Sequence, residues 1–387
     1  MTRIKKIAII TEGFPTKNNT VIYKFLEQIV SEFAKEGIQI TVINPIYHNY
    51  IKNFYKYKWS YKVLGNTINV YQPIILNYSA RKIGKIRLGE YSYRSFKKAV
   101  ERIIQTRDEE FDALYAHFLM PSGCVAAELG ALYNIPAFCA VGESNVSDAF
   151  KALGTQKVRE KCSKLKGIIS VSTDNKTKLE HYRIGKDLPI IVLPNGVDQS
   201  VFYSHDKIAC RKYYGFDQND IIGIFVGAFI DRKGPKRVEQ ASKIANIKMI
   251  YIGSGDQIPM GDNIIFKGAV DHDKLPTLLS SADFFVLPTR AEGCCNAILE
   301  AISCGLPIIS SIGKFNDDIL SPEYSIRVDP DDIKELSEAM KKLSQDSLLR
   351  RRMSECAIQT KDRFNINNRA KMIISFMDQV LLDNYLN

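Results

Sequence analysis

Long apolar runs are missing from this 387-residue sequence, and their absence argues against a membrane-spanning protein. No stretch approaches the roughly 20 consecutive apolar residues of a transmembrane helix. The first residues, MTRIKKIAIITEG, contain an apolar run of only four before Thr11 and Glu12. A secretory signal needs a longer apolar core, so we expect a buried strand here rather than a signal peptide. The sequence therefore predicts a cytoplasmic location.

The eight cysteines lack the spacing of a metal site or of a disulfide framework. No CxxC pair occurs, and no histidine lies at ligand spacing from them. Such cysteines are typical of reduced thiols in a cytosolic protein. The sequence also shows no repeat of solenoid period and no low-complexity segment.

Acidic residues are scarce in the N-terminal half. Residues 1–200 hold 29 Lys and Arg against 18 Asp and Glu, whereas the remainder holds 24 against 25. The segment Tyr50–Arg107 has 13 basic residues and two acidic ones. Its interleaved aromatic residues are Phe54, Tyr55, Tyr57, Trp59 and Tyr61. This pattern suits an anionic membrane surface, and a solvated basic loop is the alternative. No nucleic-acid-binding motif accompanies the charge, so nucleic acid is not an expected partner.

Apolar runs and helical patterns alternate along the chain, which is typical of parallel α/β sheets. The first such unit begins at Lys6, and the alternation restarts at Ile221 after the turn-rich segment VLPNGVDQSVF. The length suits two domains. We therefore expect an α/β protein with two Rossmann-like, doubly wound domains facing a central cleft. The expected bounds are 1–203 and 204–365, followed by a C-terminal helix over 366–387 that packs toward the first domain.

The stretch FFVLPTRAEGCCNAILEAISCGLPIISS, residues 284–311, reads as strand, loop, helix and strand. Gly305 and Pro307 are the expected stop signals of the helix. Glu292 lies in the loop, whereas Asn296 and Glu300 are four residues apart and share one column of the helix. Acids at the carboxyl end of a strand lie where such sheets bind ligands.

A second loop, VGAFIDRKGPKRV, follows the strand that begins near Ile221. Gly227 ends the strand, and Pro235 suits the first turn of a helix. Arg232 and Lys233 lie beside that helix N-terminus, where a diphosphate would be held by cations and free N–H groups. Taken alone, these two cations fit an ordinary solvated loop equally well.

The ordered set of motifs resembles glycosyltransferase family 4, retaining enzymes of the GT-B fold. EGCCNAILEAISCGLPIISS is similar to the E-x7-E signature of that family. The supporting pieces stand in family order, and they are AHFLMPSG at 116–123, VLPNGVDQSVF at 192–202, VGAFIDRKG at 226–234, YIGSGD at 251–256 and FKGAVDHDKL at 266–275. The match covers nearly the whole chain.

The resemblance implies a role for each matching residue of the donor half. Glu300 corresponds to the acid that binds the ribose of a nucleotide-sugar, and Glu292 to the acid near the transferred sugar. Lys233 with Arg232 corresponds to the diphosphate clamp. The remaining implied donor residues are Gly227, Gly293, Cys294, Cys295 and Asn296.

The N-terminal half supplies the other implied residues. His117 corresponds to the family histidine that reaches the donor sugar, and with Glu292 and Lys233 it completes the predicted catalytic set. The alternative is that His117 is a structural histidine at a strand end, with all of its hydrogen bonds made inside the protein. The first loop, with Gly13, Phe14 and Asn19, corresponds to the acceptor side.

The chain departs from the family pattern at several positions. Ala228 replaces a common arginine, so Arg232 is expected to supply that charge. The first loop lacks the common Gly-Gly pair. GKFNDD replaces a second Gly-Gly pair, which makes Phe315, Asn316 and Asp317 candidates for lining the donor site. Glu143 stands where members often have an acid or a serine.

A metal and a resident cofactor are not expected. Asp271-His272-Asp273 matches the metal-binding DxD pattern of other glycosyltransferases, but it precedes a helix, where Asp is expected as a cap. The family relies on cations and helix N–H groups for the diphosphate. The donor is expected to be a UDP- or GDP-linked sugar.

The sequence predicts a retaining glycosyltransferase that moves a hexose-type sugar onto a hydroxyl of a glycan or lipid-linked glycan. The acceptor implied is of the polysaccharide-biosynthesis type, and the basic N-terminal half suggests peripheral attachment to the inner membrane face. One alternative is a hydrolase or epimerase that uses Glu292 and Glu300 as paired carboxylates. Another is a nucleotide-sugar or nucleic-acid binding module without turnover.

Overall fold

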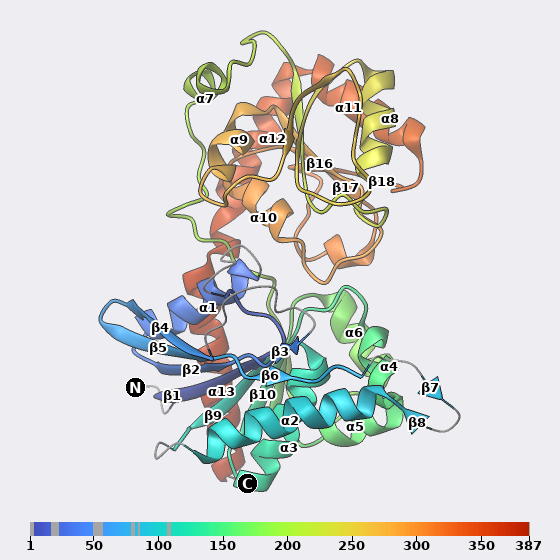
Figure 1. Ribbon diagram of the computed structural model, residues 1–387. Coiled ribbons are helices and arrows are strands. Elements are labelled where there is room, and N and C mark those ends of the chain that lie inside the picture. Colours follow the sequence, from blue (N-terminus) through green and yellow to red (C-terminus); the bar gives the residue numbers. More distant parts are fainter. Residues whose placement is uncertain are drawn as a thin grey trace. The chain divides into compact units, whose positions relative to one another are not determined.

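Two compact α/β units make up the chain in the computed structural model (Figure 1). The structure describes residues 4–16, 23–48, 57–78, 82–83, 86–106 and 110–386. Unit 1 comprises residues 1–193 and 367–387, and unit 2 comprises residues 194–366. The sequence placed these boundaries at 203 and 365.

Unit 1 is built on an eight-stranded sheet of order β12-β11-β10-β9-β1-β2-β5-β4. Its strands are β1 (Lys6–Thr11), β2 (Gln39–Ile43), β4 (Lys58–Val63), β5 (Asn66–Tyr71), β9 (Ala113–His117), β10 (Ala137–Val141), β11 (Gly167–Ser170) and β12 (Ile190–Val192). All neighbours pair in parallel except β4 and β5. The strands β1, β9 and β10 are buried throughout most of their length, as expected for a parallel sheet with helices on both faces.

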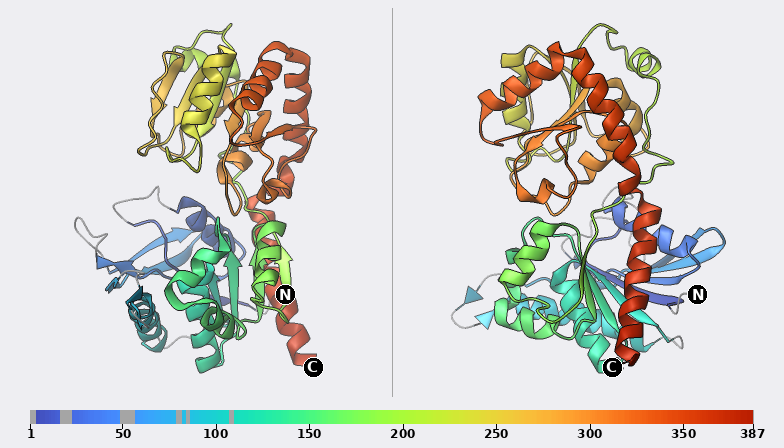
Figure 2. Two further views of the ribbon diagram at one scale, coloured as in Figure 1. Left: turned by 90° about the vertical axis from the view of Figure 1, so that its right-hand side faces the viewer. Right: turned by 180° about the vertical axis from the view of Figure 1, so that it is seen from behind.

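Helices cover both faces of this sheet. They are α1 (Lys24–Lys35), α2 (Gly89–Gln105), α3 (Cys124–Tyr133), α4 (Phe150–Leu153), α5 (Thr155–Cys162), α6 (Thr173–His181) and α13 (Ile366–Leu386). Leu114 and Ala116 join the core formed with α2, α3 and α5. Tyr115 points the other way and packs edge-on against Phe33 of α1. Helix α13 lies along unit 1 (Figure 2), where Phe376 packs against Phe138 of β10.

Unit 2 is built on a six-stranded parallel sheet of order β15-β14-β13-β16-β17-β18. Its strands are β13 (Ile222–Val226), β14 (Lys248–Ile252), β15 (Ile264–Gly268), β16 (Phe284–Leu287), β17 (Ile308–Ser311) and β18 (Ser325–Val328). Its helices are α7 (Lys207–Tyr214), α8 (Pro235–Ala245), α9 (Leu275–Ser281), α10 (Asn296–Ser303), α11 (Ile333–Gln345) and α12 (Ser347–Thr360). Helix α8 packs beside α11, and α10 packs beside α12. The predicted α/β class with two Rossmann-like, parallel-sheet domains is confirmed.

The sequence left two interpretations of the basic segment Tyr50–Arg107, an anionic membrane surface and a solvated loop. Its described part contains the β4–β5 hairpin and the 17-residue helix α2. Trp59 stacks on Tyr61 and donates a hydrogen bond to Gln72, whereas Tyr57 is exposed. Phe54 and Tyr55 lie outside the described residues. No helix in the described part of the chain is both long and apolar enough to cross a membrane.

Candidate functional site

Three charged side chains of unit 2 meet at the carboxyl edge of its sheet. Arg232 and Lys233 lie in the loop between β13 and α8, and Glu292 lies in the loop between β16 and α10. Glu292 Oε1 accepts hydrogen bonds from Arg232 Nη1 at 2.8 Å and from Thr289 Oγ1 at 2.9 Å. Lys233 Nζ lies 2.5 Å from the same oxygen. The structure thus joins the predicted clamp to the predicted sugar-side acid.

Burial makes this cluster electrostatically strong. The side chains of Lys233 and Glu292 are 13% and 9% exposed. Burial lowers the pKa of Lys233, but Cys295 and Glu292 outweigh that effect, so its pKa lies above the ordinary value. Lys233 therefore stays charged at neutral pH. A buried cation of this kind needs an anionic partner, and Glu292 supplies it in this structure.

Two helices begin beside these residues with free N–H groups. Helix α8 follows Gly234, which has a φ of 80°, and carries a proline in its first turn. Helix α10 follows Cys295. Among the residues that the structure describes, no side chain caps the first amides of either helix. Uncapped N-terminal amides and the helix dipole favour an anion, and phosphate is a common one.

The glycines of GSG, residues 253–255, follow β14 and are fixed by close backbone approach. A Cβ on Gly253 would lie 2.0 Å from the carbonyl oxygen of Gly227, and one on Gly255 would lie 2.3 Å from that of Phe229. Gly253 also has a φ of 149°. These glycines support the loop that carries Gly227, beside the Lys233 side chain.

Glu300 has a different partner from Glu292. Its Oε1 lies 3.2 Å from His272 Nε2, and the side chain is 13% exposed. The imidazole of His272 packs edge-on against Phe202, with ring centroids 4.9 Å apart. His272 thus holds Glu300 in place. Sequence reasoning missed this pair, because it took the His as the middle of a helix-capping turn.

The sequence predicted that an Asp of the turn Asp271-His272-Asp273 caps helix α9. The residue that precedes α9 is Lys274, and no side chain caps the helix. The prediction that an Asp caps this helix is therefore wrong. Within the described ranges, no three His, Cys, Asp or Glu side chains gather as a metal ion would require.

The loop before α10 is tied to the start of unit 2. Asn195 Nδ2 donates to Asn296 Oδ1 at 2.8 Å, and the backbone N–H of Asn195 contacts Cys294 Sγ at 3.3 Å. Gly293 and Cys295 are buried in the same loop. Asn195 is a further residue that positions this loop. The only feature of the sequence that pointed to Asn195 was the turn motif PNG, residues 194–196.

Phe315, Asn316 and Asp317, the candidates for lining the donor site in place of a second Gly-Gly pair, are held by contacts within unit 2. Phe315 is buried, and Asn316 Nδ2 donates to the carbonyl oxygen of Ser311 at 2.9 Å. Asp317 pairs with Arg327 at 2.7 Å. These contacts fix the turn after β17.

His117 ends strand β9 in unit 1. It is 2% exposed, its Nδ1 has no hydrogen-bond partner in the described part of the chain, and burial lowers its pKa to about 3. The imidazole is therefore neutral at physiological pH. The alternative, a structural histidine with all of its hydrogen bonds made, does not fit, because Nδ1 has no partner among the described residues.

Glu143 lies next to the glycine that approaches this imidazole. A Cβ on Gly142 would be 3.6 Å from His117 Nε2. Glu143 Oε1 accepts a hydrogen bond from the Leu119 N–H, whereas its Oε2 is buried without a partner among the described residues. Burial raises the pKa of Glu143 to about 7. The carboxyl edge of this sheet thus holds two buried polar atoms that have no hydrogen-bond partner among the described residues, His117 Nδ1 and Glu143 Oε2.

The predicted acceptor-side residues fall partly outside the description. Thr11 Oγ1 donates to the Gly13 carbonyl oxygen at 2.9 Å, which fixes the turn after β1. Phe14 is buried and packs near Trp59, with ring centroids 6.4 Å apart. Asn19 lies outside the described residues.

Comparison with known proteins identifies the type of the C-terminal unit. Residues 206–360 match the family "Glycosyl transferases group 1". A relative from Bacillus subtilis, the putative teichuronic acid biosynthesis glycosyltransferase TuaC, is 25% identical over 95% of this chain and 97% of its own. The Escherichia coli UDP-Gal:alpha-D-GlcNAc-diphosphoundecaprenol alpha-1,3-galactosyltransferase is 26% identical over 48% of this chain and 53% of its own.

Solved structures share the whole fold. Sucrose-phosphate synthase from Thermosynechococcus elongatus has a TM-score of 0.77 at 17% identity, over 98% of this chain and 100% of that one. HepE from Anabaena, solved with UDP, has a TM-score of 0.72 at 14% identity, over 97% and 100%. The GT-B fold is therefore confirmed. The prediction of a glycosyltransferase enzyme is confirmed too, by the match of residues 206–360 to the Glycosyl transferases group 1 model and by the glycosyltransferase relatives.

Proposed function

We propose that this glycosyltransferase moves a hexose-type sugar, with retention, from a UDP- or GDP-linked donor to a hydroxyl of a glycan or lipid-linked glycan. The observation that carries the proposal is the cluster of Arg232, Lys233 and Glu292 beside two uncapped helix N-termini. This arrangement presents fixed positive charge at the residues for which the resemblance implies a diphosphate. Fixed cations and amides stabilise the charge that develops on a leaving diphosphate.

Glu292 Oε1 occupies the position of an anion on Arg232 and Lys233. Donor binding then places phosphate oxygens on these cations. Glu292 becomes free to accept hydrogen bonds from hydroxyls of the transferred sugar. This exchange keeps the buried Lys233 paired in both states, which avoids the cost of an unpaired buried charge.

Glu300 is proposed to accept hydrogen bonds from the ribose hydroxyls. It is a partly buried carboxylate, and His272 fixes its orientation. Because Glu292 and Glu300 have separate cationic or imidazole partners, they do not resemble a shared pair of hydrolytic carboxylates. Two hydrogen bonds from hydroxyls to a carboxylate contribute about 2–4 kcal/mol to donor binding.

Retention requires that the acceptor hydroxyl attack from the face that the diphosphate leaves. We assign His117 to the transferred sugar on the basis of the resemblance. Its neutral imidazole, with a pKa lowered to about 3 by burial, suits hydrogen bonding to sugar hydroxyls rather than pairing with phosphate. The reaction is proposed to need neither a metal nor a resident cofactor.

The names of two relatives support a polymer or lipid-linked acceptor. One relative is named a putative teichuronic acid biosynthesis glycosyltransferase, and another a galactosyltransferase that uses UDP-Gal and alpha-D-GlcNAc-diphosphoundecaprenol. A polymer or lipid-linked acceptor is consistent with peripheral attachment of this chain to the inner membrane face. The exposed Leu76, Tyr78 and Tyr91 of unit 1 support such attachment, since amphipathic and apolar side chains insert at lipid interfaces.

The test of the activity is a release assay with UDP-, GDP- and ADP-sugars and a series of lipid-diphosphate acceptors. We expect release of one nucleoside diphosphate that depends on acceptor, and a product whose anomeric configuration matches that of the donor by NMR. Inversion at the anomeric carbon would refute retention. Release of free sugar at the full rate without acceptor would instead support the hydrolase alternative.

Membrane attachment has its own test. Vesicles rich in anionic lipid should retain the protein at low salt, and Leu76→Ser with Tyr91→Ser should weaken retention. Leu132→Ser, which changes another exposed apolar residue of unit 1, is the matched control. Equal loss in the control, or no retention of the unaltered protein, would remove this part of the proposal.

A further inference from the structure

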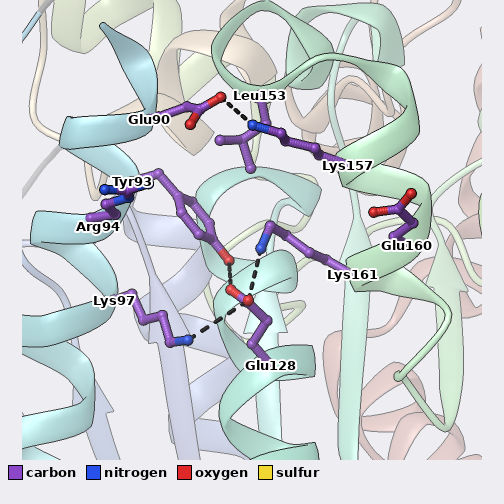
Figure 3. Close-up of a pocket in the computed structure, with 9 residues that line it drawn as sticks. All are labelled: Glu90, Tyr93, Arg94, Lys97, Glu128, Leu153, Lys157, Glu160 and Lys161. Carbon is purple, nitrogen blue, oxygen red and sulfur yellow. Dashed lines mark hydrogen bonds and ion pairs between the residues drawn. The ribbon is translucent and has the colours of Figure 1, made fainter. Parts of the chain in front are cut away.

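A cavity lies on the flank of unit 1, between helices α2, α3 and α5 (Figure 3). Its volume is about 370 Å³. That volume is within the range of small-molecule sites and is large enough for a monosaccharide. The lining residues are Glu90, Tyr93, Arg94, Lys97, Glu128, Leu153, Lys157, Glu160 and Lys161. None of them belongs to the residues assigned above to donor or acceptor.

Cations come from both walls of this flank pocket. Arg94 and Lys97 project from α2, and Lys157 and Lys161 project from α5 (Figure 3). The four cations face three carboxylates, which leaves an excess of one positive charge. Such a balance favours an anion without excluding hydrogen-bonding hydroxyl groups.

Glu128 is the centre of the pocket and is already fully engaged. Its Oε1 lies 2.7 Å from Lys161 Nζ and 3.7 Å from Lys97 Nζ, and its Oε2 accepts a hydrogen bond from the Tyr93 hydroxyl. One carboxylate therefore faces two ammonium groups. The Lys161 ammonium also lies over the Tyr93 ring, 5.0 Å from its centroid. The inner end of the pocket thus keeps a net positive charge.

Arg94 is the cation with the most capacity left. In the described part of the chain no carboxylate lies in salt-bridge distance of its guanidinium, which instead lies 5.9 Å from the centroid of the Tyr91 ring. Arg94 is exposed, and Lys157, which pairs with Glu90, is 52% exposed. Both side chains can turn toward a ligand at little cost to packing. Guanidinium binds carboxylate and phosphate through two parallel hydrogen bonds.

The remaining lining suits a sugar better than a bare anion. The acids Glu90 and Glu160 offer acceptors for sugar hydroxyls, while the buried Tyr93 and Leu153 form an apolar floor. A simple phosphate site would need no such acceptors, since carboxylates repel phosphate. We propose that the flank pocket binds an anionic sugar unit, a hexuronate or a hexose phosphate. Only the source of that sugar, a glycan on which the enzyme acts, rests on the proposed function.

The test is a binding titration of the full chain with glucuronate and with glucose 6-phosphate, followed by saturation-transfer NMR or calorimetry. Glucose and inorganic phosphate are the comparison ligands. We expect one or both anionic sugars to bind at low salt, more tightly than either comparison ligand. The two anionic sugars distinguish a carboxylate source from a phosphate source.

Arg94→Gln combined with Lys157→Gln should weaken this binding roughly tenfold, the effect of removing charge-assisted hydrogen bonds. Lys176→Gln is the matched control, because Lys176 is a partly exposed lysine of α6 that does not line the pocket. Both altered side chains are exposed, so folding is not at risk.

Several results would overturn the inference. These are no binding of either anionic sugar, equal binding of glucose, equal binding of inorganic phosphate, or unchanged affinity in the double variant. The titration requires neither donor nor turnover. Its failure would therefore leave the proposed transfer reaction standing, and failure of that reaction would leave the pocket's ligand measurable.

Discussion

At the scale of single residues, the buried carboxyl of Glu143 makes the stability of the protein depend on pH. Its pKa is raised to about 7 by burial, from an ordinary value of 4.5. Between these values the folded state binds a proton that the unfolded state has lost, so the contribution of Glu143 to stability falls as pH rises from 4.5 through 7.

Glu143→Gln should therefore stabilise the protein more at pH 8 than at pH 5. The expected difference between the two pH values is about 1–3 kcal/mol in the free energy of unfolding. Denaturant titrations at the two pH values measure it. Glu180→Gln changes an exposed carboxylate of the same unit and should give the same small shift at both. A pH-independent effect of Glu143→Gln would contradict this assignment.

His272 gives a second test at this scale. Its contact with Glu300 predicts that His272→Ala weakens nucleoside diphosphate binding about fivefold, which is the effect of losing one orienting hydrogen bond. His205→Ala is the control, because His205 stacks on Tyr203 and does not contact Glu300. Calorimetric titration with UDP and GDP distinguishes the outcomes. Equal affinities of the two variants would show that His272 does not position Glu300.

At the scale of elements, the sequence predicted the strands and helices wherever apolar periodicity is strong. The buried strands β1, β9, β13 and β16 are short apolar runs bounded by polar loops, so local pattern suffices. Helix α2 was missed because its many basic residues dominated the reading of Tyr50–Arg107. Its buried positions 93, 96, 100, 103 and 104 follow a helical period that the same sequence contains.

The candidate site was predictable only in part. Motif resemblance located Glu292, Lys233 and Glu300 individually, and the sheet brings the first two to the same edge. The contacts of Glu292 with Lys233 and of His272 with Glu300 depend on side-chain directions in separate loops. Periodicity carries no information on those directions. The unpartnered atoms of His117 and Glu143 depend on three-dimensional burial in the same way.

The loop after β14 allows a prediction that isolates steric approach from backbone strain. Gly253→Ala should destabilise unit 2 and weaken nucleotide binding, because the added Cβ would lie 2.0 Å from the Gly227 carbonyl oxygen. Gly268 has a φ of 152°, close to the 149° of Gly253, but a Cβ there would meet no atom within 4 Å. Gly268→Ala therefore measures the strain alone, about 1–3 kcal/mol.

Thermal unfolding and UDP titration of both variants decide the matter. Gly253→Ala should lower the melting temperature further than Gly268→Ala. It should also reduce affinity, since the Gly227 loop adjoins Lys233. Equal effects of the two substitutions would show that the close approach does not constrain the loop.

At the scale of the whole molecule, the two units have separate cores. Helix α13 comes last in the chain but contributes to unit 1 through Phe376 and Asp378, the latter accepting a hydrogen bond from the Ile4 N–H at 3.3 Å. The C-terminal segment is thus part of the N-terminal fold. The predicted donor residues, apart from His117, all lie in unit 2.

Phe376→Ala should destabilise unit 1 by about 2–4 kcal/mol, because it removes a large side chain packed on Phe138 and Gly167. Nucleotide affinity, which we propose to reside in unit 2, should change little. Met372→Ala alters an exposed residue of the same helix and is the control for both readouts. A large loss of nucleotide affinity in Phe376→Ala at a temperature where the protein stays folded would contradict the separation of tasks.

The central claim is that unit 2 binds the diphosphate of the donor through Lys233. It is tested most directly by titrating UDP, GDP and ADP into the unaltered chain, Lys233→Gln and Lys236→Gln. Lys236 is the matched control, since it lies three residues further along and pairs with Glu239 on α8. We predict that Lys233→Gln loses roughly 10- to 100-fold in affinity for the preferred nucleotide, whereas Lys236→Gln retains it. Equal affinity of all three proteins would contradict the account.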